Sequence, residues 1–371
     1  MDALRWDVFC RVVDNYGDAG VCWRLARALA AEHALDVTLR IDRLATLARF
    51  EPSIDPRRAV QSCAGVTVRP LDDAAPVDAL PNVVVEAFGC GLPPRYVAAM
   101  ASSAAPPVWI NLEYLSAEPW VDSVHAMASA QPRADLTRYF WFPGFTQHTG
   151  GLIRESGLLD ARDAFQAREA RRGPADPLRI VLFCYPSRAL PALFDAWAES
   201  DEPVACAIPE GVATAALDRW LAGDVPHAGR EVVRGRLTLD VAPFTTQDAF
   251  DRLLWRSDLN FVRGEDSFVR AQWAARPFVW QPYPQAEKAH LLKLDAFLAR
   301  YAAGLDPPPQ RALTRFWQSF NAEDGVGAAA AWPDFRGALA ALAEHGRRWS
   351  GELAALPELT AGLVEFARGR L

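Results

Sequence analysis

Apolar runs with strand propensity alternate with amphipathic segments along the first half of the chain, a pattern typical of a parallel sheet wrapped by helices. The run 4–13 predicts a first strand. After a polar turn, Val21, Leu25, Ala28 and Leu29 have helical spacing, which predicts a helix over 21–31. The same alternation continues with predicted strands at 37–41, 82–88 and 107–112 and a predicted helix at 94–101.

The pattern restarts after a polar stretch over 168–177, which indicates a domain boundary. Strands are then predicted at 178–184, 203–208, 237–241, 259–262 and 277–281. Helices are predicted at 189–198, 212–221, 247–255 and 268–275, and the segment 290–371 is almost wholly helical.

The length of 371 residues with 51% apolar content exceeds what one hydrophobic core usually organises. We therefore expect two Rossmann-like domains, at 1–170 and 171–371, with C-terminal helices able to pack back on the first domain. Ligands bind at the carboxyl edges of such sheets. An α/β chain of this kind, with two Rossmann-like domains facing across a cleft, fits a GT-B glycosyltransferase, although epimerases, periplasmic binding proteins and dehydrogenases share the arrangement.

Composition narrows the possible partners and the compartment. The net charge is -7 and the Lys and Arg residues are scattered, which argues against a nucleic-acid partner. The N-terminus lacks the pattern of a signal peptide, and no apolar window is long enough for a membrane span. The six cysteines are spread without a C-x-x-C pair. We expect a cytoplasmic protein without membrane attachment, disulfides or a metal site.

Two carboxylates, Asp14 and Asp18, are the first candidates for chemistry. They stand with Asn15 and Gly17 where a dinucleotide-binding fold would carry its glycine-rich turn. A carboxylate repels phosphate, so this turn favours general-base work on an acceptor. The alternative is that one of these acids caps a helix that begins near Ala19.

A second acidic turn follows the predicted strand at 259–262. Backbone N–H groups at the next helix start, with Arg263 and the Ser267 hydroxyl, could hold a diphosphate. Glu265 and Asp266 could accept hydrogen bonds from sugar hydroxyls, orient Arg263, or only cap the helix.

Aromatic residues follow two other strands of the second half. Phe183 and Tyr185 come after one strand, and Phe244 and Gln247 after another. Aromatic faces there could sandwich a nucleobase whose edge Gln247 reads, or could simply fill the core.

These motifs resemble the bacterial protein-arginine rhamnosyltransferases that modify translation elongation factor P. The resemblance covers nearly the whole chain, through the segments 9–24, 183–186, 243–248, 263–267, 273–280 and 283–285. It implies an inverting, metal-independent GT-B enzyme without a cofactor. The implied donor is dTDP-β-L-rhamnose, and the implied acceptor is an arginine of elongation factor P.

The resemblance also implies roles for single residues. Asp14, Asp18 and Glu265 would be the catalytic acids, with Asp18 the preferred general base. Residues implied to contact ligand are Asn15, Tyr16, Gly17, Phe183, Tyr185, Phe244, Gln247, Arg263, Asp266 and Ser267. Such a reaction needs carboxylates, because a guanidinium is a poor nucleophile until one polarises it or removes a proton.

Two other functions remain open at this stage. A non-catalytic nucleotide-sugar-binding regulatory protein would use the same cleft without turnover. A nicotinamide oxidoreductase is disfavoured because the first turn lacks the G-x-G-x-x-G pattern.

Overall fold

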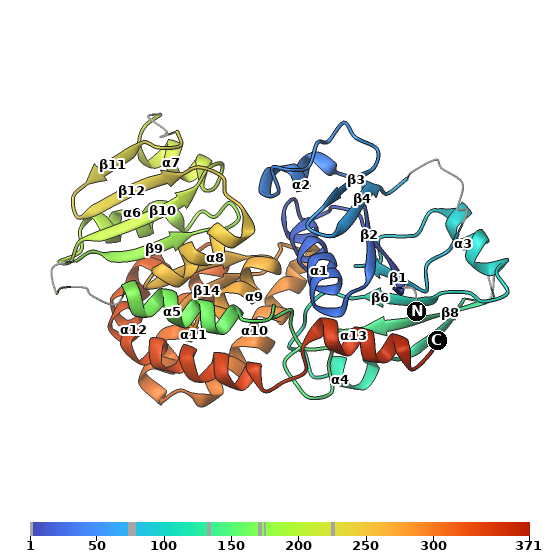
Figure 1. Cartoon of the computed structure of the whole chain (residues 1–371). Helices are drawn as coiled ribbons and strands as arrows, with labels where there is room; N and C mark the ends of the chain where they lie inside the picture. Colours follow the sequence, from blue (N-terminus) through green and yellow to red (C-terminus); the bar gives the residue numbers. More distant parts are fainter. Residues whose placement is uncertain (1–2, 73–78, 132–134, 170–172, 174–175, 224–226) are drawn as a thin grey trace. The chain divides into compact units, whose positions relative to one another are not determined.

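The structure is a computed structural model that describes residues 3–72, 79–131, 135–169, 173, 176–223 and 227–371. The chain divides into two compact units (Figure 1). The first unit consists of Met1–Leu158 and Ala354–Leu371, and the second of Leu159–Leu353.

The first unit is built on an eight-stranded sheet of order β3-β4-β2-β1-β5-β6-β8-β7. Its strands are β1 (Arg5–Cys10), β2 (Asp36–Ile41), β3 (Gln61–Cys63), β4 (Val66–Pro70), β5 (Val83–Ala87), β6 (Val108–Leu112), β7 (Ala128–Gln131) and β8 (Leu136–Trp141). Its helices are α1 (Gly17–His33), α2 (Leu44–Phe50), α3 (Pro94–Ala101), α4 (Val121–Val124) and α13 (Leu359–Arg368). Strands β3 and β7 are antiparallel to their neighbours, and the other six form a parallel sheet in Rossmann order.

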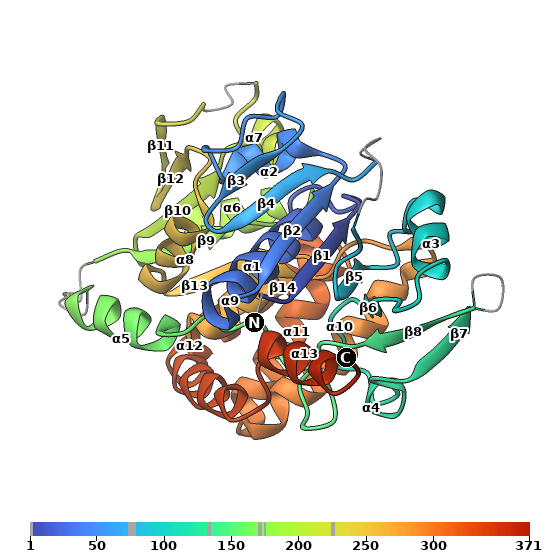
Figure 2. The ribbon, with the colours of Figure 1, turned by 45° about the vertical axis from the view of Figure 1, so that its right-hand side comes forward.

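Helices cover both faces of this sheet, with α1 on one face and α3 on the other (Figure 2). All but the first residue of β1 are buried, because the strand lies in the middle of the sheet. On the α3 face, the Tyr96 ring meets Phe9 edge to face at 4.8 Å. The Tyr96 hydroxyl donates to Asp7 Oδ2 at 2.8 Å. Alternating side chains of one strand thus anchor α3 to the sheet.

The second unit is built on a six-stranded sheet of order β11-β12-β10-β9-β13-β14. Its strands are β9 (Leu178–Leu182), β10 (Val204–Pro209), β11 (Glu231–Arg234), β12 (Leu237–Ala242), β13 (Leu259–Arg263) and β14 (Phe278–Gln281). Its helices are α5 (Leu158–Glu169), α6 (Leu190–Ala198), α7 (Thr214–Trp220), α8 (Gln247–Arg256), α9 (Asp266–Trp273), α10 (Ala289–Tyr301), α11 (Pro307–Asn321) and α12 (Gly325–Ala354), with 3-10 turns η1 (Ala286–Lys288) and η2 (Ala302–Gly304). All strands except β11 are parallel to their neighbours, again in Rossmann order.

The boundary between the units lies at 158/159, whereas the sequence analysis places it at 170/171. Helix α5 accounts for the difference, because it packs within the second unit. Arg162 Nη1 donates to the carbonyl of Trp273 and to Ser350 Oγ, both at 2.9 Å. The polar stretch predicted at 168–177 begins in the last turn of this helix, and its residues 170–172 and 174–175 lie outside the described residues. Composition does not reveal the sheet on which a helix packs.

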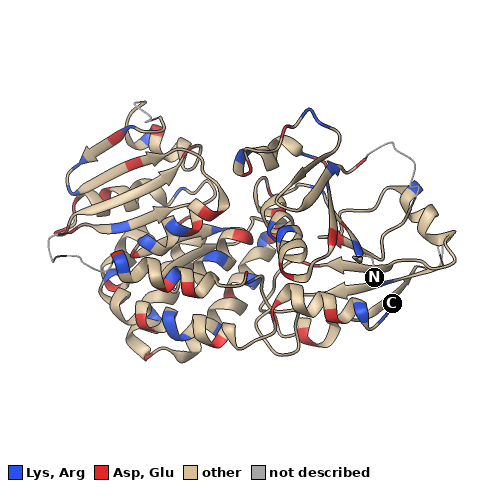
Figure 3. Cartoon of the chain, in the orientation of Figure 1, with Lys and Arg blue, Asp and Glu red and all other residues tan. Residues whose placement is uncertain are grey.

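Most predicted elements are present, with shifted ends. The helix predicted at 21–31 begins earlier, at Gly17, and the predicted strands at 37–41 and 107–112 are β2 and β6. The strands β3, β4, β7, β8 and β11 were not predicted. Acidic and basic side chains are interspersed over both units (Figure 3). Across the described residues, no helix combines the length and the apolar content needed to span a membrane.

Candidate functional site

The turn between β1 and α1 lies where the strand order of the first sheet reverses, between β1 and β5. Open α/β sheets bind their ligands at this position. Within the turn, Asn15 has a positive φ of 35°. The Gly17 N–H donates to the Asp14 carbonyl at 2.6 Å. A Cβ at Gly17 would lie 2.5 Å from Asp14 Oδ2, so glycine leaves room for that carboxylate beside the start of the helix.

Asp18 lies in the first turn of α1, and its side chain bonds the loop before the helix. Its Oδ2 accepts hydrogen bonds from the N–H groups of Val13 at 2.7 Å and Asp14 at 2.8 Å. Tyr16 occupies the N-cap position and makes no side-chain cap bond. Neither acid occupies the N-cap position, and the Asp18 side chain bonds N–H groups of the loop that precedes the helix.

The environment of Asp18 suits a proton acceptor. The residue is only 2% exposed. Burial raises the pKa of its carboxyl, while the bonds from Asp14, Val13 and Tyr114 lower the pKa and the charge of Asp42 raises it. Because the net effect is upward, the carboxylate is more basic than an exposed aspartate.

Tyr114 is a site residue that the sequence analysis missed. Its hydroxyl faces Asp18 Oδ1 at 3.4 Å. Its ring stacks on Phe88, with the centroids 4.3 Å apart and the planes 11° apart. Tyr114 follows β6 closely, so its position just after a predicted strand was the available signal. Asp42, at the end of β2, was missed as well, and its Oδ1 accepts from the Val12 N–H at 2.9 Å.

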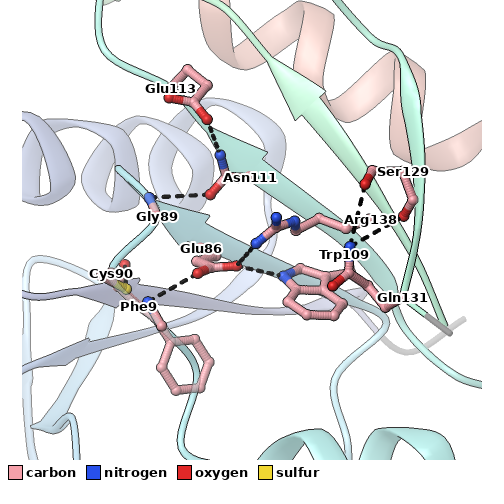
Figure 4. A network of polar contacts seen from close by, with 11 residues as sticks. Phe9, Glu86, Gly89, Cys90, Trp109, Asn111, Glu113, Ser129, Gln131 and Arg138 are labelled. Carbon is pink, nitrogen blue, oxygen red and sulfur yellow. Dashed lines mark hydrogen bonds and ion pairs between the residues drawn. The ribbon is translucent and has the colours of Figure 1, made fainter. Parts of the chain in front are cut away.

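A polar network joins the loops that follow β5 and β6 (Figure 4). Asn111 Oδ1 accepts from the Gly89 N–H at 3.1 Å, and Asn111 Nδ2 donates to Glu113. Nearby, the buried Glu86 accepts from Trp109 Nε1 at 3.1 Å and from Arg138 at 3.3 Å. These bonds fix the two loops that carry Phe88 and Tyr114.

In the second unit, Arg263 at the end of β13 lies over two of the predicted aromatic residues. Its guanidinium carbon is 4.4 Å from the centre of the Phe183 ring and 4.9 Å from that of Tyr185. Its Nη1 donates to the Cys184 carbonyl at 3.0 Å. The strand order of this sheet reverses between β9 and β13, so the cation lies at the position equivalent to the acidic turn of the first unit.

The turn after β13 is closed by the Ser267 hydroxyl. Ser267 Oγ accepts from the Arg263 N–H at 3.0 Å and donates to the Arg263 carbonyl at 2.6 Å. Gly264 has a positive φ of 58°, and its carbonyl accepts from Trp280 Nε1 at 2.8 Å. Glu265 occupies the N-cap position of α9 but makes no side-chain cap bond. Capping by its carboxylate is therefore not the role of Glu265.

The remaining predicted residues lie around the same sheet edge. Tyr185 is buried, and its N–H donates to Gln281 Oε1 at 2.8 Å. Gln247 Nε2 donates to Asp266 Oδ2 at 3.5 Å. Phe244 is half-buried in the loop after β12. The second unit thus groups the predicted donor residues, and the first unit groups Asp14 to Asp18. Among the described residues, no cluster of three or more His, Cys, Asp or Glu side chains could hold a metal ion.

Two Rossmann-like units in one chain are the architecture of GT-B glycosyltransferases, and solved structures of that class match this chain. A solved structure of the calicheamicin glycosyltransferase CalG4 is 13% identical, matches with a TM-score of 0.53 and covers 100% of both chains, which shows the fold alone.

Closer relatives identify the family. The sequence model of the family described as "Elongation-Factor P (EF-P) rhamnosyltransferase EarP" matches residues 6–368. A protein-arginine rhamnosyltransferase of Pseudomonas putida is 46% identical, over 99% of both sequences. A structure described as the basis for EarP-mediated arginine glycosylation of elongation factor EF-P is 35% identical with a TM-score of 0.69, and the match covers 99% of this chain and 100% of that one. The chain therefore belongs to the EarP family of protein-arginine rhamnosyltransferases.

Proposed function

We propose that this protein is an inverting transferase that moves rhamnose from dTDP-β-L-rhamnose to an arginine side chain of translation elongation factor P. The family membership supports the sugar and the type of acceptor. The observation that carries the mechanism is the buried Asp18 carboxylate, one oxygen of which is held by two backbone N–H groups. The other oxygen is the natural acceptor for a guanidinium proton.

The first unit holds the acceptor in this proposal. Asp14, Asp18 and Asp42 give the carboxyl edge of its sheet a negative character, which attracts and orients a guanidinium. The acceptor nitrogen attacks the anomeric carbon of rhamnose, and the bond from that carbon to the diphosphate oxygen breaks. The electron pair leaves with dTDP, and the guanidinium proton passes to Asp18 Oδ1. A single displacement of this kind inverts the anomeric centre.

The second unit holds the donor. Arg263 supplies a positive charge at the sheet edge, and the first turn of α9 supplies backbone N–H groups for the diphosphate. This cation and these dipoles stabilise the leaving group in place of a metal ion. Asp266, Ser267 and Glu265 surround the donor, and Phe183, Tyr185, Phe244 and Gln247 hold its thymidine. Because the acceptor is a translation factor, the reaction takes place in the cytoplasm.

The test is incubation of the purified protein with elongation factor P and dTDP-rhamnose in the presence of EDTA, followed by mass spectrometry. We expect one deoxyhexose to be added to one arginine. Asp18→Asn should lower the rate by roughly 10³-fold or more but keep dTDP binding, because it removes the base and not the donor site. Arg263→Met should also slow the transfer, because it removes a charge that stabilises the leaving group, but unlike Asp18→Asn it should weaken dTDP binding about tenfold.

A regulatory protein that only binds a nucleotide sugar is the competing function. It would bind dTDP-rhamnose without any product, and Asp18→Asn would have no effect. Either result would overturn the proposal.

A further inference from the structure

We propose that Tyr114 is a positioning residue for the transfer reaction, whose hydroxyl aims Asp18 Oδ1 as the proton acceptor. The inference rests on the proposed function, because it names a second residue of the same acceptor site. Tyr114 belongs to the loop after β6 and Asp18 to the first turn of α1, and their contact joins residues 96 positions apart.

The two oxygens of the Asp18 carboxylate have different surroundings. Oδ2 is held by two short bonds from backbone N–H groups, at 2.7 and 2.8 Å. Oδ1 meets the Tyr114 hydroxyl at 3.4 Å. The carboxylate is thus bonded closely at Oδ2 by the backbone, and it has a longer contact at Oδ1 with the Tyr114 hydroxyl.

The hydroxyl itself is held rigidly by the residues around it. The Tyr114 ring is stacked on Phe88, which has a positive φ of 58° directly after β5. The N–H of Phe88 donates to the carbonyl of Leu112, and the Asn111 side chain links Gly89 to Glu113 (Figure 4). Two neighbouring strand ends therefore place one hydroxyl against one carboxylate oxygen, as a preorganised site requires.

The contact with Tyr114 opposes the effect of burial on the pKa of Asp18. Burial and the charge of Asp42 raise the pKa of the Asp18 carboxyl, whereas the Tyr114 hydroxyl and the N–H groups of Val13 and Asp14 lower it. Cys22, further along α1, also interacts with Asp18 electrostatically. Tyr114 thus helps to keep a buried carboxyl ionised, and therefore available as a proton acceptor, at neutral pH.

Tyr114→Phe tests this role, because it removes the hydroxyl and keeps the ring stack on Phe88. We expect kcat to fall about tenfold with the KM for dTDP-rhamnose unchanged. Loss of the hydroxyl raises the pKa of Asp18, so the acidic limb of the pH profile of kcat/KM should move to higher pH. The matched control is Tyr96→Phe, which removes a hydroxyl bonded to Asp7 on the α3 face of the same sheet. This control should leave the acidic limb in place.

A direct titration separates this inference from the proposed function. The Asp18 carboxyl is followed by carbon NMR in the wild type and in Tyr114→Phe, with the signal assigned by its loss in Asp18→Asn. A higher pKa in Tyr114→Phe supports the contact, and an unchanged pKa overturns the inference whether or not rhamnose is transferred. If the wild type transfers nothing, the proposed function fails, and with it the catalytic role of Tyr114. A slower Tyr114→Phe enzyme with an unmoved acidic limb would indicate a merely structural tyrosine and would also overturn the inference.

Discussion

Asp18 in the first unit and Asp251 in the second are both nearly completely buried, at 2% and 4% exposed, but they have different partners. Both oxygens of Asp251 accept from the guanidinium of Arg270, at 3.0 and 2.6 Å. Asp18 instead bonds two backbone N–H groups and, weakly, the Tyr114 hydroxyl. A buried carboxylate with a bidentate arginine holds helices together, whereas one bonded to neutral donors retains the capacity to bind a cation from outside.

The largest effect on stability is expected from breaking the ion pair between Asp251 and Arg270 in the second unit. Asp251→Asn leaves the Arg270 charge buried without its counter-charge, which destabilises a protein by about 3–5 kcal/mol. Urea unfolding and hydrogen exchange of α8 and α9 measure this loss. The control is Asp334→Asn, since Asp334 forms an exposed ion pair with Arg315 at 3.8 Å and its loss should not change unfolding measurably. Equal unfolding of the two variants would contradict a structural role for Asp251.

A smaller effect, on activity rather than on stability, is expected from a change in the turn that carries Asp14 and Asp18. Gly17→Ala places a methyl group where Asp14 Oδ2 now lies, so the Asp14 carboxylate must move. Misplacing a catalytic group by about 1 Å slows reactions up to roughly 100-fold, and we expect a loss of transfer of about 10- to 100-fold. Any loss of stability should be small, because the methyl group meets the end of a side chain and alanine is the better helix former.

Gly337→Ala in α12 is the matched control for this change, because a Cβ at Gly337 would meet nothing within 4 Å beyond the adjacent backbone of its own helix. The prediction is tested by comparing the transfer rates and the thermal unfolding of Gly17→Ala and Gly337→Ala. An active Gly17→Ala enzyme would remove Asp14 from the proposed mechanism.

The comparison of the two aspartates also shows what sequence reasoning could reach. The central strands were predictable because buried parallel strands are continuous apolar runs, as in residues 82–88 around β5, whereas the partly exposed outer strands such as β4 and β8 were missed. The hypothesis that the acids at 14 and 18 take part in the chemistry followed from their place after the first strand. The start of α1 was missed because its first residues, Gly17 and Asp18, interrupt the apolar spacing.

Other features depend on the three-dimensional arrangement of the chain. The Tyr114 contact requires β6 to lie two strands away from β1 in the sheet, and no local pattern encodes that order. The position of the Arg263 guanidinium over the rings of Phe183 and Tyr185 likewise depends on the pairing of β9 with β13. The sequence grouped these three residues at one sheet edge but could not show that the cation lies against the rings.

The smallest effect we expect is a gain of stability when Asp18 is neutralised. The folded-state pKa of Asp18 is raised above its usual value, mainly by burial. An acid with a raised pKa in the folded state binds its proton more tightly there, so it disfavours folding above that pKa, and the penalty disappears as the pH falls. The stability of Asp18→Asn lacks this dependence on pH. The stability of the variant relative to the wild type should therefore increase from about pH 4 to pH 7.

Hydrogen exchange of β1 and α1 across this pH range measures the difference within the first unit. Asp42→Asn is a second variant for this experiment. It removes a charge that raises the pKa of Asp18, so it should reduce the pH dependence of the stability without abolishing it. If the difference in stability between Asp18→Asn and the wild type does not change with pH, Asp18 is no more basic than an exposed aspartate. Its bonds to Val13 and Asp14 would then balance its burial, and the distinction from Asp251 would rest on geometry alone.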